Sequence, residues 1–434
     1  MGFFKKKKKL LIIGLDGVPY EMITGFADSG VMPNLGKVFR KIPPVKMEVT
    51  IPEISSISWT SFMTGTDSGE HGIFGFVDLV KGTYKYRFPD FRDNKAVPFF
   101  DELGEKGKRS VIINLPSTFP ARKIPGVLIS GFVALDLKRA VYPRSYLEIL
   151  EKEGYEVDVD TSKGKNKKKE FLSDLHYTLR TRKNIADMLW KNEKWDIFMF
   201  TVTGTDRIHH FMFDSYVDKE HEYHNDFLDY YREVDKIIGD FLQKIEGKDE
   251  IELMLSSDHG FGLLKNEIYL NQILKKNGLF DLEKSEKISL TSISNNSKAF
   301  AVDPSRIFIN LKKKFPNGSV EKKDYEKIRS EIKNLFENYK INGDKVIKKV
   351  FYKEELYSSK YLDMAADIIL LSNPGYDLKA GLRQDKEFGK NHFTGMHLQN
   401  NAFFYSSIPE EIPENMHITD VKRQIFSALK VKTG

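Results

Sequence analysis

Several short apolar runs along the chain lead into an acidic residue. They are LLIIGL before Asp16, IFMFTV shortly before Asp206, and IELMLSS before Asp258. Runs of this length, bounded by Gly, Asp or Ser, are typical of strands that are buried on both faces. Amphipathic stretches at residues 171–191 and 225–245 predict helices between them. Strands that alternate with helices predict an α/β fold whose mostly parallel sheet is covered on both faces.

The same patterns predict further elements. Extended segments are expected at residues 9–16, 45–52, 110–116, 126–132, 196–203 and 366–376, and helices at 20–30, 58–64, 324–339 and 418–429. Residues 76–95 lack a core pattern, residues 134–175 are polar and basic, and residues 263–303 predict irregular structure.

The ends of the apolar runs carry the candidate chemistry. In an open α/β sheet, ligands bind beyond the carboxyl ends of the strands. Three acids and three histidines are available there: Asp16, Asp206, His210, Asp258, His259 and His397. Such a set can hold two divalent metals, and a dimetal site clamps the attacking and leaving oxygens of phosphoryl transfer. The pattern favours a metal-dependent phosphohydrolase.

Composition narrows this chemistry. The chain of 434 residues has no cysteine, so any metal must be held by Asp, Glu, His or hydroxyl oxygen. The net charge of +6 is mild, and the basic runs at 5–9 and 163–169 are typical of solvated surface segments. Because no aromatic residues interleave with the second run, we expect no nucleic-acid partner. The apolar run after the N-terminal lysines is too short for a signal sequence or a membrane span, and we expect a cytoplasmic protein.

A candidate nucleophile lies in residues 50–76, TIPEISSISWTSFMTGTDSGEHGIFGF. Here the chain resembles the alkaline phosphatase superfamily, in particular its type I phosphodiesterase/nucleotide pyrophosphatase branch. Members carry a Thr or Ser nucleophile about ten residues before a T-G, followed by H-G-I. Thr64-Gly65 and His71-Gly72-Ile73 match, and this register places the nucleophile at Ser55. The resemblance runs from about residue 9 to the end of the chain.

The resemblance implies a three-layer sandwich and a two-metal site. One metal would be held by Asp16, Ser55, Asp258 and His259, and the other by Asp206, His210 and His397. Ser55 would form a phospho-seryl intermediate with a small-molecule phosphate ester. Zinc is the expected ion, and manganese, which serves in related mutases, is the alternative.

Neighbouring residues leave three assignments open. Ser56, Ser58 and Thr60 are rivals of Ser55, and only the family register separates them. His209 competes with His210, which is favoured because the family spacing from Asp206 is four; on a helical turn, two residues four apart lie on one face. His392 competes with His397, which fits the family's G-x-H followed by N-x-F. His71 matches the family but is interpreted as structural.

The expected architecture is a single catalytic domain over residues 1–434, with cap or insertion segments at 76–175 and 263–360. A phosphodiesterase is the favoured function, and a phosphomutase or phosphomonoesterase is the alternative within the superfamily. A sulfatase is disfavoured because Ser55 lacks the C/S-x-P-x-R context. A catalytically silent binding protein is the alternative from another class, although the full ligand set disfavours it.

A diester is favoured over a monoester because a monoester carries an additional negative charge. Enzymes that prefer monoesters usually add a third metal or an Arg clamp. Near Ser55 no arginine occurs between Arg40 and Arg87. Arg207 is the one candidate clamp, although in a helix its side chain is expected to face away from Asp206.

Overall fold

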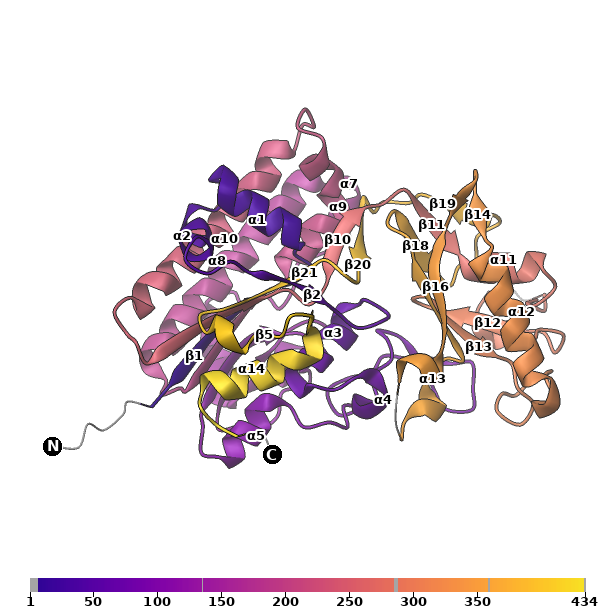
Figure 1. The fold of residues 1–434 in the computed structure, drawn as a ribbon, viewed down its shortest axis with the longest axis horizontal. Coiled ribbons are helices and arrows are strands. Elements are labelled where there is room, and N and C mark those ends of the chain that lie inside the picture. Colours follow the sequence, from indigo (N-terminus) through magenta and orange to yellow (C-terminus); the bar gives the residue numbers. More distant parts are fainter. Residues whose placement is uncertain (1–6, 135, 285–287, 358–359, 433–434) are drawn as a thin grey trace. The chain divides into compact units, whose positions relative to one another are not determined.

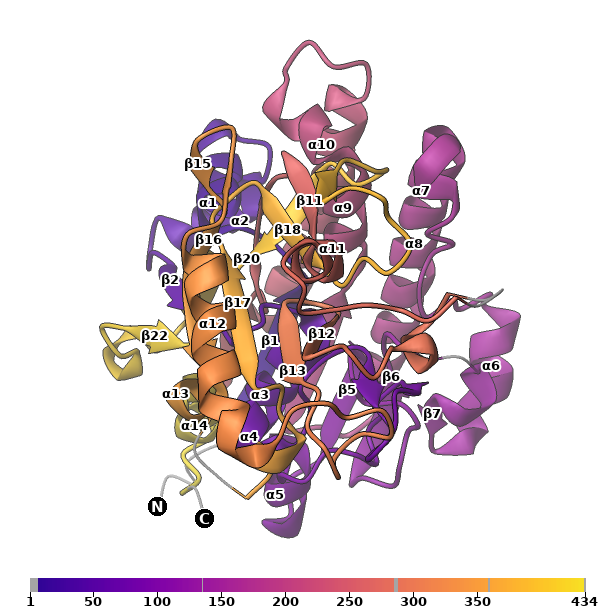
Figure 2. The same ribbon diagram turned by 90° about the vertical axis from the view of Figure 1, so that its right-hand side faces the viewer.

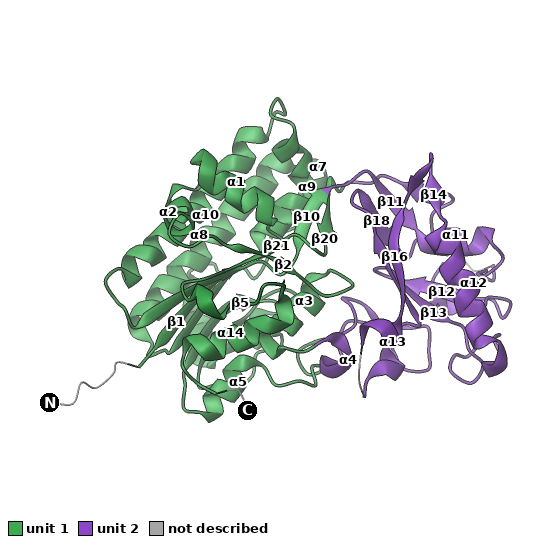
Figure 3. Ribbon diagram, in the orientation of Figure 1, with its two compact units in different colours: residues 1–66, 90–262, 393–434 green, residues 67–89, 263–392 purple. Residues whose placement is uncertain are grey.

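The protein is described here by a computed structural model (Figure 1). The described residues are 7–134, 136–284, 288–357 and 360–432. Lys5 and Lys6 of the N-terminal basic run lie outside them. The chain forms two compact units, which Figure 3 distinguishes. Unit 1 comprises residues 1–66, 90–262 and 393–434, and unit 2 comprises residues 67–89 and 263–392.

Among the described residues, unit 1 contains a nine-stranded sheet with the order β22-β2-β21-β9-β1-β8-β5-β6-β7. The strands are β1 (Lys9–Leu15), β2 (Val45–Glu48), β5 (Ser110–Leu115), β6 (Gly126–Ser130), β7 (Val141–Tyr142), β8 (Ile197–Val202), β9 (Ile251–Ser256), β21 (Ala402–Ser406) and β22 (Met416–His417). The central run β9-β1-β8-β5-β6 is parallel, whereas β21 and β7 are antiparallel to their neighbours. The structure confirms the predicted α/β fold with a mostly parallel sheet.

Side chains of β1 alternate between two cores, because successive residues of a strand point to opposite faces. Leu11, Ile13 and Leu15 belong to one core, and Leu10 and Ile12 to the other. The first core includes α1 (Tyr20–Ser29), α2 (Pro33–Phe39), α8 (Lys168–Asn192), α9 (Gly204–Val217) and α10 (His224–Ile245). The second includes α3 (Ser55–Thr64), α5 (Phe99–Glu105) and α14 (Val421–Ala428). Figure 1 shows these layers on either side of the sheet, which makes unit 1 a three-layer sandwich.

The register of the central strands aligns their carboxyl ends. Gly14 of β1 is paired with Thr201 of β8 on one side and with Ser256 of β9 on the other. The residues that follow these three strands therefore emerge at the same edge of the sheet. This edge is where the sequence analysis places the candidate ligands.

Unit 2 has a separate hydrophobic core. Its four-stranded antiparallel sheet has the order β12-β13-β17-β16. These strands are β12 (Ala299–Val302), β13 (Arg306–Ile309), β16 (Ile347–Tyr352) and β17 (Ile368–Ser372). Helix α12 (Tyr325–Glu337) packs along this sheet through Ile328, Ile332 and Phe336 (Figure 2). A smaller sheet contains β11 (Asn266–Tyr269), β18 (Tyr376–Lys379) and β19 (Phe388–Gly389), and β11 leads into α11 (Leu270–Lys276).

Short elements complete the two units. Unit 1 also has α6 (Leu147–Lys152) and α7 (Lys163–Asn166), and β10 (Gly260–Leu263), which begins there, pairs with β20 (Gly395–Leu398). Unit 2 also has α4 (Ser68–His71), β3 (Asp78–Leu79), β4 (Tyr86–Arg87), β14 (Lys340–Ile341), β15 (Asp344–Lys345) and α13 (Lys353–Leu356).

One sequence-based expectation differs from this structure. The prediction of irregular structure over residues 263–303 is wrong, because the segment contains β11, α11 and β12. Elements of four to seven residues are too short to show a clear period. Of the two expected cap segments, residues 263–360 lie in unit 2, but residues 90–175 lie in unit 1. The reason is that β5 and β6 of this segment pair within the central sheet.

The long helices α8 and α10 are amphipathic, with one buried face and many charged residues on the other. Within the part of the chain that the structure describes, no helix is both long and apolar enough to cross a membrane.

The close packing of β1 against α3 predicts that Gly14 cannot be enlarged. A Cβ atom at this position would lie 2.7 Å from Cη2 of Trp59 and 3.2 Å from Cγ2 of Thr201, and both side chains are buried. We expect Gly14→Ala to lower the free energy of unfolding by about 1–3 kcal/mol. Urea denaturation followed by circular dichroism measures this change.

Gly25→Ala is the matched control. Gly25 lies inside α1, and a Cβ atom there would meet nothing within 4 Å. Since Ala is favoured over Gly inside a helix by roughly 0.5–1 kcal/mol, this variant should be as stable as the wild type or more stable. An equal loss of stability in both variants would contradict the packing explanation.

Candidate active site

All the residues proposed for the site lie in unit 1, near the carboxyl edge of the central sheet. Asp16 follows β1, and Asp258 and His259 follow β9. Helix α9, which begins directly after β8, carries Asp206 and His210. Ser55 is the first residue of α3, and His397 lies in β20.

Ser55 lies between the carboxylate of Asp16 and the ring of His259. Its Oγ is 3.2 Å from Oδ1 of Asp16 and 3.1 Å from Nε2 of His259. The same Nε2 is 3.6 Å from Oδ1 of Asp16 and 3.5 Å from Oδ2 of Asp258. One hydroxyl, two carboxylates and one imidazole therefore converge on a single small volume.

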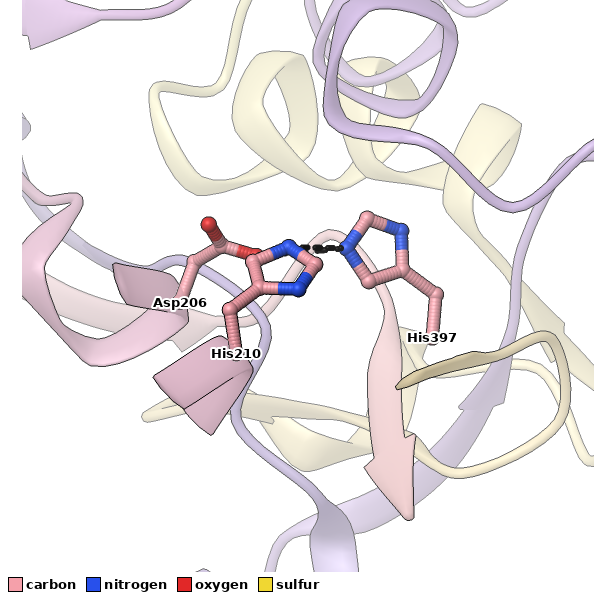
Figure 4. A group of neighbouring side chains, drawn as sticks. All are labelled: Asp206, His210 and His397. Carbon is pink, nitrogen blue, oxygen red and sulfur yellow. Dashed lines mark hydrogen bonds and ion pairs between the residues drawn. The ribbon is translucent and has the colours of Figure 1, made fainter. Parts of the chain in front are cut away.

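Asp206, His210 and His397 form a second group (Figure 4). Oδ1 of Asp206 lies 3.3 Å from Nε2 of His210 and 3.3 Å from Nε2 of His397. The two ring nitrogens are 3.0 Å apart. Figure 4 shows both rings turned toward each other beside the carboxylate.

The two groups adjoin each other through Asp206 and His259. Nε2 of His259 is 3.9 Å from Oδ1 of Asp206, and the His259 and His397 rings stack at 3.8 Å. Two sets can each hold a metal ion: Asp206 with His210 and His397, and Asp16 with Asp206 and His259. Asp206 thus belongs to both sets, whereas the sequence analysis assigned it to one.

Backbone carbonyls fix the tautomer of two of the histidines, that is, which ring nitrogen carries the proton. A carbonyl oxygen only accepts hydrogen bonds, so the ring nitrogen beside it must carry the proton. Nδ1 of His397 donates to the carbonyl of Glu53 at 2.8 Å, and Nδ1 of His259 donates to the carbonyl of Gly260 at 3.0 Å. In the neutral rings, both Nε2 atoms therefore present lone pairs to the carboxylates.

Burial and mutual repulsion shift the pKa values of the three acids. Burial, with the charges of Asp258 and Asp206, raises the pKa of Asp16 well above its usual value. Burial raises the pKa of Asp258 to about 7. Burial also acts to raise the pKa of Asp206, but the charges of His210 and Arg207 outweigh it, so that this pKa lies well below its usual value. Burial lowers the pKa of His259 to about 4 and also lowers that of His397.

This set of atoms fits divalent cations. The carboxylates are at most 3% exposed, and Oδ1 of Asp206 and Oδ2 of Asp258 have no hydrogen-bond donor among the described residues. Within that same part of the chain, Arg207 is the only lysine or arginine that forms an ion pair with any of the three. Buried acceptors without donors are costly in the absence of a cation, and oxygen and imidazole nitrogen are ligands of zinc and its neighbours.

Residues that the sequence analysis did not assign to the site position Asp16. Trp59 donates from Nε1 to Oδ2 of Asp16 at 3.1 Å, and Thr205 donates from Oγ1 to its backbone carbonyl at 2.7 Å. Trp59 is fully buried one turn after Ser55 on α3, so the same helix carries the hydroxyl and orients the carboxylate. In the sequence Trp59 is visible only as one residue of an apolar face.

Gly17 links Asp258 to His209. Its N–H donates to Oδ1 of Asp258 at 3.0 Å, and its carbonyl accepts from Nδ1 of His209 at 2.9 Å. Nε2 of His209 in turn accepts from the hydroxyl of Tyr231 at 2.7 Å. Burial lowers the pKa of His209 to about 3, so the ring is neutral and supports the turn after β1.

The structure places the candidates and several of their rivals differently. The hydroxyl of Ser58 bonds to that of Thr50, and the hydroxyl of Thr60 donates to the carbonyl of Ser56. Among the described hydroxyls, only that of Ser55 contacts both Asp16 and His259. The structure brings His210 into the group of Figure 4, whereas the ring of His209 bonds to the carbonyl of Gly17. His397 also lies in this group, whereas His392 is exposed on unit 2.

His71 lies in unit 2, outside this group. It is buried, and Nδ1 of its ring accepts from the N–H of Ile73 at 3.1 Å.

Comparison with known families identifies the chain's relatives. The sequence profile of the family described as type I phosphodiesterase / nucleotide pyrophosphatase matches residues 10–397. The chain belongs to this family. The match extends over every proposed site residue and confirms the resemblance to the alkaline phosphatase superfamily. A search of curated proteins found no significant match.

Two solved structures share the fold of the present chain. Phosphonoacetate hydrolase from Sinorhizobium meliloti 1021, in complex with phosphonoacetate, is 16% identical, with a TM-score of 0.67 over 98% of this chain and 96% of that chain. Murine ectonucleotide pyrophosphatase / phosphodiesterase 5 is 13% identical, with a TM-score of 0.55 over 98% of this chain and 96% of that chain. Membership of this family identifies the protein as a phosphoric ester hydrolase; these two neighbours show the fold.

Proposed function

We propose that this hydrolase is a two-metal phosphodiesterase that acts on a small-molecule phosphate ester through a phospho-seryl intermediate at Ser55. The main support is the position of Ser55 Oγ, 3.2 Å from Asp16 and 3.1 Å from the lone-pair nitrogen of His259. A serine hydroxyl is a weak nucleophile unless a base or a metal activates it. Here it lies among atoms suited to hold a cation.

Two ligand sets are proposed. One consists of Asp16, Ser55, Asp258 and His259, and the other of Asp206, His210 and His397. Zinc is the ion we expect and manganese is the alternative, since carboxylate oxygen and imidazole nitrogen serve both. Such ions, when bound, lower the pKa of a hydroxyl group or water and offset charge on phosphoryl oxygens.

The reaction proceeds in two displacements. Oγ of Ser55 attacks phosphorus, the bond from phosphorus to the leaving alcohol breaks, and that alcohol takes up a proton. Water then attacks the phosphoserine, the bond to Oγ breaks, and Ser55 regains its proton. The first N–H groups of α3 have no acceptor inside the helix, so the helix start attracts the phosphoryl group.

The position of Arg207 supports a diester substrate. Its Nη1 donates to Oδ2 of Asp206 at 2.7 Å, and its Nη2 donates to Asp158 at 2.7 Å. The side chain reaches Asp206 rather than facing away from it, contrary to the expectation from helix geometry. Because both ends of the guanidinium are occupied, Arg207 does not offer a clamp for the additional charge of a monoester.

The metal content tests the centre itself. Purified protein reconstituted with zinc or manganese should bind two ions per chain by elemental analysis, since two ligand sets are present. Asp258→Ala should bind one ion fewer and lose most activity. The control, Asp229→Asn, changes an exposed acid on α10 and should bind two ions. Reconstituted wild-type protein without tightly bound metal would contradict the proposal.

Substitution of the nucleophile tests the chemistry separately. Ser55→Ala should reduce kcat by roughly 10³-fold or more while metal stays bound, because the other ligands are unchanged. Ser56→Ala, one residue along the same helix, should retain most activity. If instead Ser56→Ala were inactive and Ser55→Ala retained wild-type kinetics, the nucleophile would be Ser56.

Substrate preference tests the bond type. We expect a higher kcat/KM for bis-p-nitrophenyl phosphate than for p-nitrophenyl phosphate, since the described residues of the site offer the doubly charged monoester no free arginine. A clear monoester preference would refute the diesterase assignment. The substrate panel should include sugar phosphates, whose rearrangement would indicate a mutase, and phosphonoacetate, which a solved structure of this fold binds.

A further inference from the structure

The two carboxylate oxygens of Asp206 have different surroundings. Oδ1 faces Nε2 of His210 and Nε2 of His397, each at 3.3 Å, and has no hydrogen-bond donor among the described residues. Oδ2 points the other way and accepts from Nη1 of Arg207 at 2.7 Å. The carboxylate is therefore oriented so that one specific oxygen is presented to the histidines.

Arg207 is itself held rigidly. Its Nε lies 3.2 Å and 3.0 Å from the two oxygens of Asp158, and its Nη2 lies 2.7 Å from Oδ2 of Asp158. This is the bidentate geometry in which guanidinium and carboxylate pair most strongly. The guanidinium also lies 4.2 Å from the centre of the Phe132 ring, and its side chain is only 11% exposed.

The segment that carries Asp158 is anchored beside the start of α9. Tyr155 and Val159 are buried in the core, one on each side of Asp158. Arg182 of α8, which is 2% exposed, donates from Nη2 to the carbonyl of Val157 at 3.0 Å. Nη1 of Arg182 lies 3.4 Å from the Thr201 carbonyl and from Oγ1 of Thr203, directly before α9. The position of Asp158 is thus fixed relative to Asp206.

We propose that Arg207 and Asp158 are positioning residues for the metal centre. Arg207 holds Oδ2 of Asp206 so that Oδ1 remains directed at His210 and His397, and Asp158 holds the guanidinium that does so. This inference rests on the proposed function, because it concerns the ligand set of Asp206. It assigns a role to two residues that are not ligands themselves.

Charge and orientation predict opposite effects at this position. A fixed cation 2.7 Å from a ligand repels an incoming metal ion, so charge alone predicts tighter metal binding when Arg207 is removed. Orientation predicts weaker binding, since loss of a partner that orients a ligand typically costs 10- to 100-fold in metal affinity. Arg207→Lys separates the two, because lysine keeps the positive charge but cannot hold Asp206 and Asp158 together through a planar fork.

The experiment measures stepwise zinc dissociation constants by titration against a competing chelator. The proteins are the wild type, Arg207→Lys, Asp158→Asn and His397→Ala, which marks the step that belongs to the Asp206 set. We expect Arg207→Lys and Asp158→Asn to weaken that same step by roughly 10- to 100-fold and to leave the other step unchanged. Arg232→Lys is the control, because Arg232 forms its ion pair with Asp229 on the exposed face of α10 and should bind as the wild type does.

The outcomes separate this inference from the proposed function. Suppose that the wild type binds two ions. If Arg207→Lys and Asp158→Asn then leave the step of the Asp206 set unchanged, tighten it, or weaken both steps equally, the positioning role is overturned and the metal centre is not. Wild-type protein that binds no ion would overturn both. If Arg207→Lys does not fold, Arg207→Gln decides, because loss of its charge alone predicts tighter metal binding whereas loss of orientation predicts weaker binding.

Discussion

Three buried aspartate carboxylates lie side by side at the carboxyl edge of the central sheet, and their mutual repulsion constrains the rest of unit 1. Carboxylates removed from water must be paired, protonated or bound to a cation. Arg207 pairs with Asp206, and burial raises the pKa values of Asp16 and Asp258, so these two acids bind a proton more readily than they would in water. Cations bound in place of those protons would bind the folded state and not the unfolded chain, and would therefore stabilise the folded state.

The parallel sheet makes this concentration of charge possible. Neighbouring parallel strands end at one edge, so residues separated by more than 200 positions, such as Asp16 and Asp258, meet there without any long loop. The hydrophobic cores on both faces of β1 hold that edge in place. Trp59 connects the two requirements, since its ring packs in one core and its indole N–H reaches Asp16.

The sequence was sufficient for the parallel strands at the centre of the large sheet and for the acids that follow them, because both are local patterns. Asp16 and Asp258 could be found from the apolar runs before them, and the spacing of four between Asp206 and His210 indicated a shared helical face. Ser55 required the family register, since Ser56 and Ser58 have the same local chemistry. The support from Trp59, His209 and Asp158 could not be predicted, because each acts on a residue at least 43 positions away in the chain. Strand β17 lies within the extended segment predicted at residues 366–376, but β12, β13 and β16 of unit 2 and β21 of unit 1 were missed for lack of a measurable period.

The anchoring of Asp158 changes how the surface of unit 1 should be regarded. Residues 134–175 have the composition of a tolerant insertion, of the kind that protein engineers shorten, graft or use to attach a tag. The side chain of Asp158 in this segment nevertheless holds Arg207, which bonds to Asp206, so a change to the segment would alter the position of a proposed metal ligand. Chains that share these ligands and differ in this segment would then differ in metal affinity, which gives evolution a way to adjust the centre without altering it.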